Sequence, residues 1–409
     1  MRVFRPRLQA SCSGTPPRPR RGLRVVIGLT VFFAATGSPS VALATFGGAG
    51  FTNGYVAFDG NCNSGNQQIL DINPSTVGTP PPSCTGYGQQ TTVGTDANPF
   101  YSADTATVYF ASSRNNQWQI FSIPSNFGGT ATDGATKLTA PAAQMNDFAP
   151  TVSTDGTTMA FVRCSSATTC NLETMNLGTS AVTQETTDNP LTPVNNTTTG
   201  ETDRPEFNPV ATAGGNGQEL LYECTVTVSG TQYDHICVHR IGHTVPDIDL
   251  SNQAHGSSPW AHTDENPDFK YDGSSIVFDT SGDLAGPNVI YRMAFDGTSA
   301  SAAGRIWPTA TGQGHEIDPI YSPDGTQYVW AEYGSGTYLF DWGSAFSQAV
   351  QISPSGKNIN SQPTWEGGAT QAIVSESHYA VLLPLGALVL VVGAFAYGWR
   401  RRAGSGDDS

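Results

Sequence analysis

Residues 316–321 of this chain read Glu-Ile-Asp-Pro-Ile-Tyr, and five other stretches repeat that pattern around a proline. In each stretch a polar residue lies three positions before the proline and an apolar residue lies two positions after it. Neighbouring prolines of the repeat lie 44 to 62 residues apart, and they are Pro99, Pro150, Pro205, Pro267, Pro319 and Pro363. Such a period is typical of propeller blades, each a four-stranded sheet that cannot bury its faces alone.

The repeats continue beyond the proline as predicted hairpins. Four of them carry an aspartate five positions after the proline, and a glycine follows it in three, as in Asp155-Gly156; in the fourth, Thr105 follows Asp104. Asp-Gly favours a tight turn because glycine accepts positive φ and aspartate tolerates it. The flanking β-branched and aromatic residues predict second strands over 108–110, 159–161, 276–278 and 328–330. Third strands are predicted over 118–123, 171–177, 235–240, 289–295 and 337–342.

The two ends of the repeat region complement each other. The sixth repeat stops after Trp365 with a first strand alone, whereas 53–58 and 67–72 resemble second and third strands without a first strand. We expect the two ends to share one blade, because closing the ring removes sheet edges that would otherwise invite aggregation. The predicted fold class is therefore all-β: a six-bladed β-propeller over residues 45–368, with the ends sharing one blade.

The repeat carries a resemblance to a known family. The run from Pro319 to Trp330, with its Ser-Pro-Asp-Gly core, resembles the WD40-like Pro-Asp repeat of TolB-type six-bladed propellers of bacterial envelopes. The resemblance covers roughly residues 50 to 368 by the repeat criterion. It implies a bacterial surface propeller and says little about activity, because fold and function separate readily.

Both termini carry patterns of membrane targeting. Residues 1–44 hold seven arginines, no acidic residue, an apolar run and Ala42-Leu43-Ala44, which is the pattern of a signal peptide cleaved after Ala44. Residues 379–399 carry no charge, and three arginines follow them. That length spans a hydrocarbon core of ~30 Å, and the arginines favour a cytoplasmic C-terminus. We predict a juxtamembrane linker at 369–378, a single transmembrane helix at 379–399, a cytoplasmic tail at 400–409, and a propeller on the extracytoplasmic side of the cell membrane.

Charge narrows the choice of partners. Between the two targeting segments, residues 45–399 carry a formal charge of −23. This acidity excludes nucleic acid as a partner, because phosphates require a basic surface. It favours solubility of a monomer and attracts cationic groups.

Six cysteines remain after the predicted cleavage. Pairing between sequence neighbours is the geometrically simplest of the fifteen connectivities that six cysteines allow. An oxidising compartment favours disulfides, and the lack of a Cys-x-x-Cys spacing disfavours zinc. The predicted pairs are Cys62–Cys84, Cys164–Cys170 and Cys224–Cys237.

The polar residue three positions before each proline is the candidate ligand-binding set. First strands line the channel of a propeller, so these residues are expected to circle one channel mouth: Asp96, Asp147, Thr202, Asp264, Glu316 and Asn360. Gathered carboxylates repel each other unless a cation or a raised pKa compensates them. The alternative is that each side chain braces a neighbouring blade. We expect no resident cofactor, and Ca²⁺ is the kind of ion that such a ring would attract.

Histidines form a second, weaker pattern. His235 and His239 share one face of a predicted strand, and His243 follows. A metal site would need a further convergent ligand, so hydrogen-bonded histidines are the simpler interpretation.

These patterns predict a membrane-tethered binding module for an envelope or extracellular protein or glycan. An alternative is a carbohydrate-active enzyme, a glycosidase or lyase, with no catalytic residue assigned. Its two carboxylates would need separations near ~5 Å or ~6.5–9.5 Å in an open pocket. A purely structural surface protein is a third class, and it predicts no concave polar site.

Overall fold

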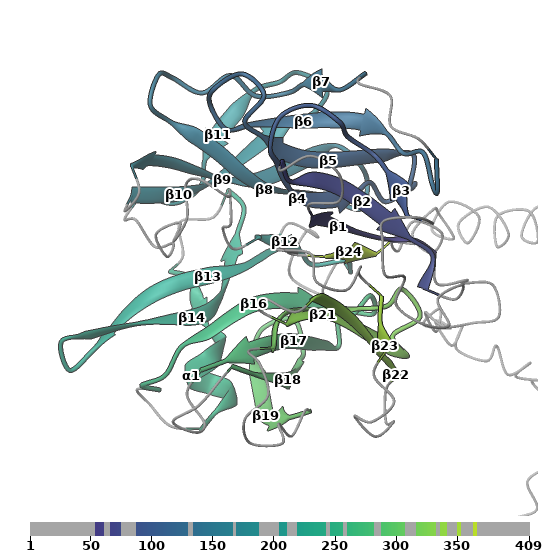
Figure 1. Ribbon diagram of the computed structural model, residues 1–409. Coiled ribbons are helices and arrows are strands. Elements are labelled where there is room, and N and C mark those ends of the chain that lie inside the picture. Colours follow the sequence, from purple (N-terminus) through teal and green to yellow (C-terminus); the bar gives the residue numbers. More distant parts are fainter. Residues whose placement is uncertain are drawn as a thin grey trace, which may run out of the picture. The chain divides into compact units, whose positions relative to one another are not determined.

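Strands account for nearly all of the regular structure in the computed structural model, which has the β-propeller fold (Figure 1). The structure describes residues 54–60, 66–74, 87–129, 134–166, 169–187, 204–210, 219–242, 246–256, 260–281, 288–306, 316–332, 336–341, 350–352 and 363–365. All of them belong to the compact unit Ala44–Ser409. The predicted signal peptide, transmembrane helix and Cys62–Cys84 pair lie outside the described residues. Within the described part of the chain, no helix combines the length and apolarity needed to cross a membrane.

The described strands form four-stranded antiparallel sheets, and all but one of these sheets are built from four consecutive strands. The first contains β4 (Asp96–Tyr101), β5 (Thr107–Ser112), β6 (Gln119–Pro124) and β7 (Thr136–Lys137). The second contains β8 (Asn146–Val152), β9 (Thr158–Ser166), β10 (Thr169–Asn176) and β11 (Val182–Gln184). The third contains β12 (Glu206–Phe207), β13 (Glu219–Val228), β14 (Thr231–Arg240) and β15 (Ile248–Asp249), and the short helix α1 (Leu250–Ala254) follows it.

Two further sheets continue the series, and a last one joins the two ends of the repeat region. The fourth contains β16 (Asp264–Phe269), β17 (Ser275–Thr280), β18 (Val289–Phe295) and β19 (Ala300–Arg305). The fifth contains β20 (Glu316–Tyr321), β21 (Gln327–Glu332), β22 (Gly336–Asp341) and β23 (Val350–Gln351). The last has the order β24 (Thr364–Trp365), β1 (Val56–Gly60), β2 (Gln68–Ile72) and β3 (Gly88–Gln89).

The ends of the repeat region therefore share one sheet, as the sequence predicts. Val56 pairs with Trp365 and Ala57 pairs with Thr364 in the antiparallel ladder between β1 and β24, which lie side by side in Figure 1. Trp365 is buried against Val56 in the same apolar cluster. Among the inner strands, β12 and β24 have two residues each, whereas the other four have six or seven.

Successive sheets contact each other through their inner strands. These contacts join β4 to β8, β8 to β12, β12 to β16, β16 to β20, β20 to β24, and β24 back to β4. Apolar side chains fill the space between sheets, as where the rings of Trp118 and Phe148 lie 5.5 Å apart in a buried cluster that also includes Met159. Each sheet thus buries its faces against its neighbours.

The proline of the repeat marks a bulge in the inner strand. In β4 the register with β5 shifts between Ala97 and Phe100, so three steps along one strand match two along the other. The same shift occurs at Phe148/Thr151, Glu265/Asp268 and Ile317/Ile320. Proline cannot donate to a ladder, so within sheets it lies at edges or bulges. The residue before the proline takes positive φ in these four strands: Asn98 at 50°, Ala149 at 47°, Asn266 at 52° and Asp318 at 54°.

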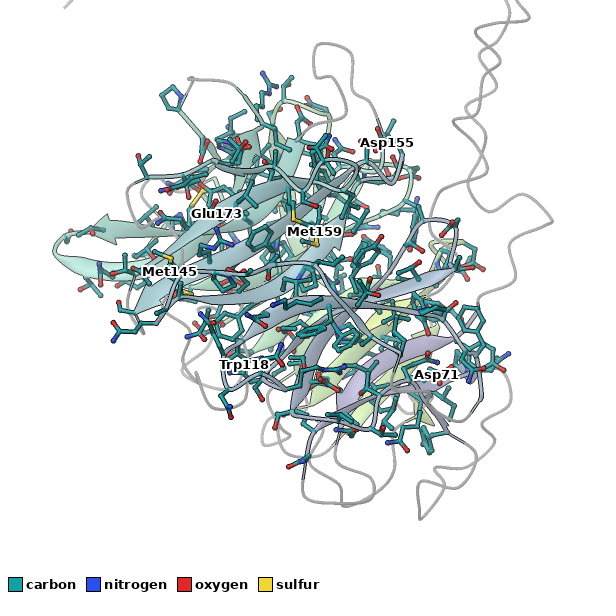
Figure 2. The ribbon with its side chains drawn as sticks, turned by 90° about the horizontal axis from the view of Figure 1, so that it is seen from above. Asp71, Trp118, Met145, Asp155, Met159 and Glu173 are labelled. Carbon is teal, nitrogen blue, oxygen red and sulfur yellow. A yellow bond between two sulfur atoms is a disulfide. The ribbon has the colours of Figure 1, made fainter. Side chains whose placement is uncertain are left out.

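The predicted Asp-Gly turns are present after the bulges. At Asp155 (Figure 2), the carboxylate accepts from the Ser153 hydroxyl at 2.6 Å and from the Thr157 amide at 3.0 Å. Partial burial works to raise the pKa of Asp155, but these hydrogen bonds outweigh it and lower that pKa. The next residue, Gly156, has φ of +70°.

Two of the predicted disulfides form within the described residues. Cys164 and Cys170 lie opposite each other on β9 and β10, with their Cα atoms 4.0 Å apart. Cys224 and Cys237 lie on β13 and β14, two residues out of the paired register, with Cα atoms 5.8 Å apart. Each disulfide therefore joins the two strands of one hairpin.

The turn after β4 offers a test of backbone strain. Thr105 replaces the usual glycine and still takes φ of 59°, a conformation that is costly for a β-branched residue. We expect Thr105→Gly to raise the free energy of unfolding by about 1 kcal/mol, measured by urea titration. The reciprocal control is Gly156→Thr, where open space surrounds the added Cβ, so that strain alone should destabilise the protein. Equal stability of both variants and the wild type would contradict this account.

Candidate functional site

A cavity lies where the inner strands of all the sheets meet. The space that water-sized molecules can occupy in it is about 60 Å³, and all the space between its atoms, with the open mouth and the solvent in it, is about 610 Å³. Each inner strand contributes the residue directly after its proline, and these residues are Phe100, Thr151, Glu206, Asp268, Ile320 and Thr364. The proline-centred repeat of the sequence thus builds a ring of side chains around one cavity.

Two side chains of this ring are acidic, Glu206 and Asp268, and both lie near Arg204, which lines the same cavity. Arg204, which precedes β12, places Nη2 3.9 Å from Oε2 of Glu206 and 4.0 Å from Oδ1 of Asp268. The Glu206 and Asp268 carboxyl groups are close enough for each to shift the pKa of the other. Two acids therefore share one guanidinium in a largely enclosed space.

Contacts across the cavity hold Arg204 in place. Its Nη1 donates to the carbonyl oxygen of Pro363 at 3.1 Å, from the segment that leads into β24. Its Cζ lies 5.4 Å from the centre of the Phe100 ring on β4. Only 7% of the Arg204 side chain is exposed, and its Nε has no hydrogen-bond partner among the described residues.

Burial and mutual repulsion set the protonation of the acid pair. Burial, followed by the charge of Asp268, raises the pKa of Glu206 well above its usual range, although Arg204 opposes the change. Burial also raises the pKa of Asp268, although Glu206, Arg204 and the Tyr321 amide each work to lower it. The Tyr321 amide donates to the Asp268 carboxylate at 2.8 Å. The Tyr321 amide stabilises the charge of Asp268, so Glu206 is the group that retains a proton.

Aromatic side chains form much of the remaining wall. Phe100, Tyr271, Tyr321 and Trp365 line the cavity. Burial, with the nearby Asp268 and Glu206, raises the pKa of the Tyr271 phenol far above its usual value. The cavity therefore offers a few polar groups within apolar and aromatic walls, which is the usual composition of a binding site.

The acids three positions before the prolines lie elsewhere. Asp96, Asp147 and Asp264 are fully buried, and none of them lines this cavity. The one-residue bulge explains the separation, because it reverses which face of the sheet the later residues of the strand occupy. Asp96 pairs with Ser112 and Phe100 with Tyr109, three positions apart on β5, so these two side chains lie on opposite faces.

Each of these three acids has a basic partner. Arg114 contacts Asp96 at 3.1 Å, and Arg163 forms a two-pronged pair with Asp147 at 2.7 and 3.0 Å. Nε2 of His255 lies 3.1 Å from Asp264. Burial raises the pKa of Asp96, and Arg114 opposes that change.

The other three predicted site residues are less fully described. Thr202 and Asn360 lie outside the described residues. Glu316 begins β20, and the structure describes its backbone only.

The predicted histidine pair is buried and bonded to carboxylates. Nδ1 of His235 lies 2.8 Å from Asp249, and Nδ1 of His239 lies 2.9 Å from Asp247. Burial works to lower the pKa of His239, but Asp247 and Glu185 outweigh it and raise that pKa to about 9. In the described part of the chain, no group of three or more His, Cys, Asp or Glu side chains is arranged to hold a metal ion.

Sequence reasoning missed the charged residues of the cavity. Arg204, Glu206 and Asp268 lie directly beside prolines, in strands that the repeat places at the centre of the fold. Charged residues are seldom buried unless they are paired. Charge next to the proline of a buried strand was therefore the signal that could have located this site.

Comparison with known proteins supports the fold. No family model and no curated protein matches the sequence. Among solved structures, TolB from Acinetobacter baumannii is similar with a TM-score of 0.54 and 14% identity, over 76% of this chain and 66% of that one. Hydrazine synthase from Kuenenia stuttgartiensis is similar with a TM-score of 0.53 and 12% identity, over 77% of this chain and 47% of that one. The chain thus spans just under two thirds of the TolB structure and about half of the other. At these identities the likeness shows the propeller fold alone.

The acid pair generates a prediction about pH. The folded protein retains a proton on Glu206 that the unfolded chain releases above its ordinary pKa, so the free energy of unfolding should fall as pH rises above about 4.3. Glu206→Gln should remove this fall and be the more stable protein at pH 8. Each pKa unit of difference corresponds to about 1.4 kcal/mol.

Urea titrations from pH 4 to pH 9 would measure this effect. The control is Asp155→Asn. The folded protein lowers the pKa of the Asp155 carboxyl, so the contribution of this group to the free energy of unfolding changes only at more acidic pH. A Glu206→Gln curve parallel to the wild-type curve would show that Glu206 ionises normally in the folded protein.

Proposed function

We propose that this chain is a protein-binding β-propeller whose binding site is the cavity around Arg204, Glu206 and Asp268. The observation that carries the proposal is the buried Arg204 side chain, which lines the cavity and whose Nε has no hydrogen-bond partner in the described part of the chain. An unsatisfied buried donor is costly, and a bound partner would satisfy it. The propeller fold that the chain shares with TolB is consistent with a binding role.

We further propose that all the four-stranded sheets are blades of one closed six-bladed ring. The contacts between successive inner strands, including β24 with β4, support this arrangement. The membrane helix at 379–399 and the signal peptide at 1–44 complete the proposal. They would present the cavity outside the cytoplasm, where the two disulfides are stable.

Binding is favoured over carbohydrate cleavage by the surroundings of the acids. Glu206 and Asp268 both lie against Nη2 of Arg204, at 3.9 and 4.0 Å, whereas a glycosidase needs two carboxyl groups that flank the substrate. Asp96, Asp147 and Asp264 are each committed to a basic partner in the interior. A channel cation such as Ca²⁺ stays a prediction.

Obstruction of the cavity mouth tests the proposed site. Ala103 lines the cavity, whereas Ala106 is exposed on the same turn and does not. The full chain, carrying a tag, would be cross-linked in its own cells and captured with its partners. We expect Ala103→Trp to recover about tenfold less partner than wild type, a loss of ~1.4 kcal/mol in binding free energy. Ala106→Trp should recover the wild-type amount.

Thermal unfolding of the three proteins provides the control for folding. Equal melting temperatures would assign the loss of partner to the cavity. Undiminished partner recovery with Ala103→Trp would place the binding surface elsewhere on the propeller.

A further inference from the structure

The cavity presents two polar atoms that lack fixed partners. Nε of Arg204 is a donor with no acceptor among the described residues, on a side chain that is 7% exposed. Once Glu206 is ionised, its Oε2 is an acceptor with no donor in the described part of the chain, and it lies 3.9 Å from Nη2 of the same arginine. A ligand that satisfies both atoms must carry a hydrogen-bond donor close to an acceptor oxygen.

The charge of the cavity adds a third condition. Arg204 contributes one positive charge, and Glu206 and Asp268 contribute two negative charges when ionised. The ionised site therefore lacks one positive charge, and in the unbound protein a retained proton supplies it. A ligand that brings a single positive charge would replace that proton.

Few chemical groups meet all three conditions. A lysine side chain brings charge and donors but no adjacent oxygen. A sugar brings donors and acceptors but no charge, and a metal ion would repel the Arg204 N–H. The first residue of a polypeptide brings an ammonium group with a carbonyl oxygen beside it.

We propose that the cavity binds the free N-terminus of a partner polypeptide, with its ammonium group on Glu206 and Asp268 and its first carbonyl oxygen on Nε of Arg204. This inference rests on the proposed function and names the chemical group that the site recognises. The aromatic walls, including Tyr271 and Trp365, suit both an ammonium group and an apolar first side chain.

Binding should depend on pH through identified groups. The titratable and charged residues that line the cavity are Tyr101 from β4, Arg204 and Glu206 at β12, Asp268 from β16, Tyr271 after it and Tyr321 from β20. Asp318 from β20 lines a second pocket with Arg204. From β8 and β24 the cavity receives no titratable side chain. The pKa of Tyr271 is raised and that of Tyr321 is raised to about 12, so both phenols stay neutral. Binding should therefore weaken at low pH, where the acid pair is protonated. It should also weaken above pH ~8, where the ligand amine loses its proton.

Calorimetric titration of the full chain in detergent micelles would test this inference. The probes are trialanine amide with a free amine, the same peptide with an N-terminal acetyl group, and N-acetyl-lysine amide. We expect the free-amine peptide to bind at least about tenfold more tightly than the other two, with a bell-shaped dependence on pH. Glu206→Gln should reduce that affinity about tenfold. Asp155→Asn removes a carboxylate that lies outside the cavity, so it should leave the affinity unchanged.

Several results would overturn the inference. Equal binding of the acetylated peptide would remove the role of the amine, and equal binding of N-acetyl-lysine amide would indicate a general site for cations. Binding of methyl glucoside in place of the peptides would indicate a glycan site. If every peptide fails while partner capture still depends on Ala103, this inference is wrong and the proposed function stands. If capture is also insensitive to Ala103→Trp, both fail.

Discussion

Proline's missing N–H is the constraint on which the rest of this structure depends. Placed in the innermost strand of a sheet, it interrupts the ladder and is accommodated by a one-residue bulge. In β4 that bulge puts Asp96 and Phe100 on opposite faces of the sheet. The residue after the proline then reaches the cavity, while the acid before the bulge is enclosed by protein. The same geometry recurs in β8, β16 and β20.

This division gives the two sets of acids different electrostatic environments. Asp147 is enclosed with its own arginine, and such a pair is sensitive to loss of either partner because the remaining charge would be buried alone. Glu206 and Asp268 instead share one arginine beside an open cavity. Incomplete compensation of this kind is unfavourable for stability and useful for binding, since a ligand can supply the missing charge. The proposed site therefore lies where the fold leaves polar groups unsatisfied.

Much of the fold could be predicted from the sequence, because each repeat marks its own strands. The predicted third strand at 289–295 matches β18, and the second strand at 276–278 lies inside β17. The sharing of one sheet by β24 and β1 and the Cys164–Cys170 and Cys224–Cys237 disulfides were likewise predictable. All of these follow from local periodicity, turn residues and spacing.

The location of the cavity residues could not be predicted in the same way. In a regular strand, residues four positions apart share a face, so Asp96 and Phe100 would both have faced the channel. The bulge that separates them appears in the sequence only as an ordinary proline. The contacts of Arg204 are equally hidden in the sequence, because this residue donates to the carbonyl oxygen of Pro363, 159 positions away along the chain.

The two ends of the repeat region meet around this cavity and hold Arg204. Hydrogen exchange measured by mass spectrometry on the full chain with Trp365→Ala tests this arrangement most directly. We predict faster exchange at residues 54–60, because this segment pairs with β24. We also predict faster exchange at residues 204–210, which are far away in sequence, because Arg204 donates to the carbonyl oxygen of Pro363 beside β24. Faster exchange confined to 54–60, with 204–210 unchanged, would contradict it.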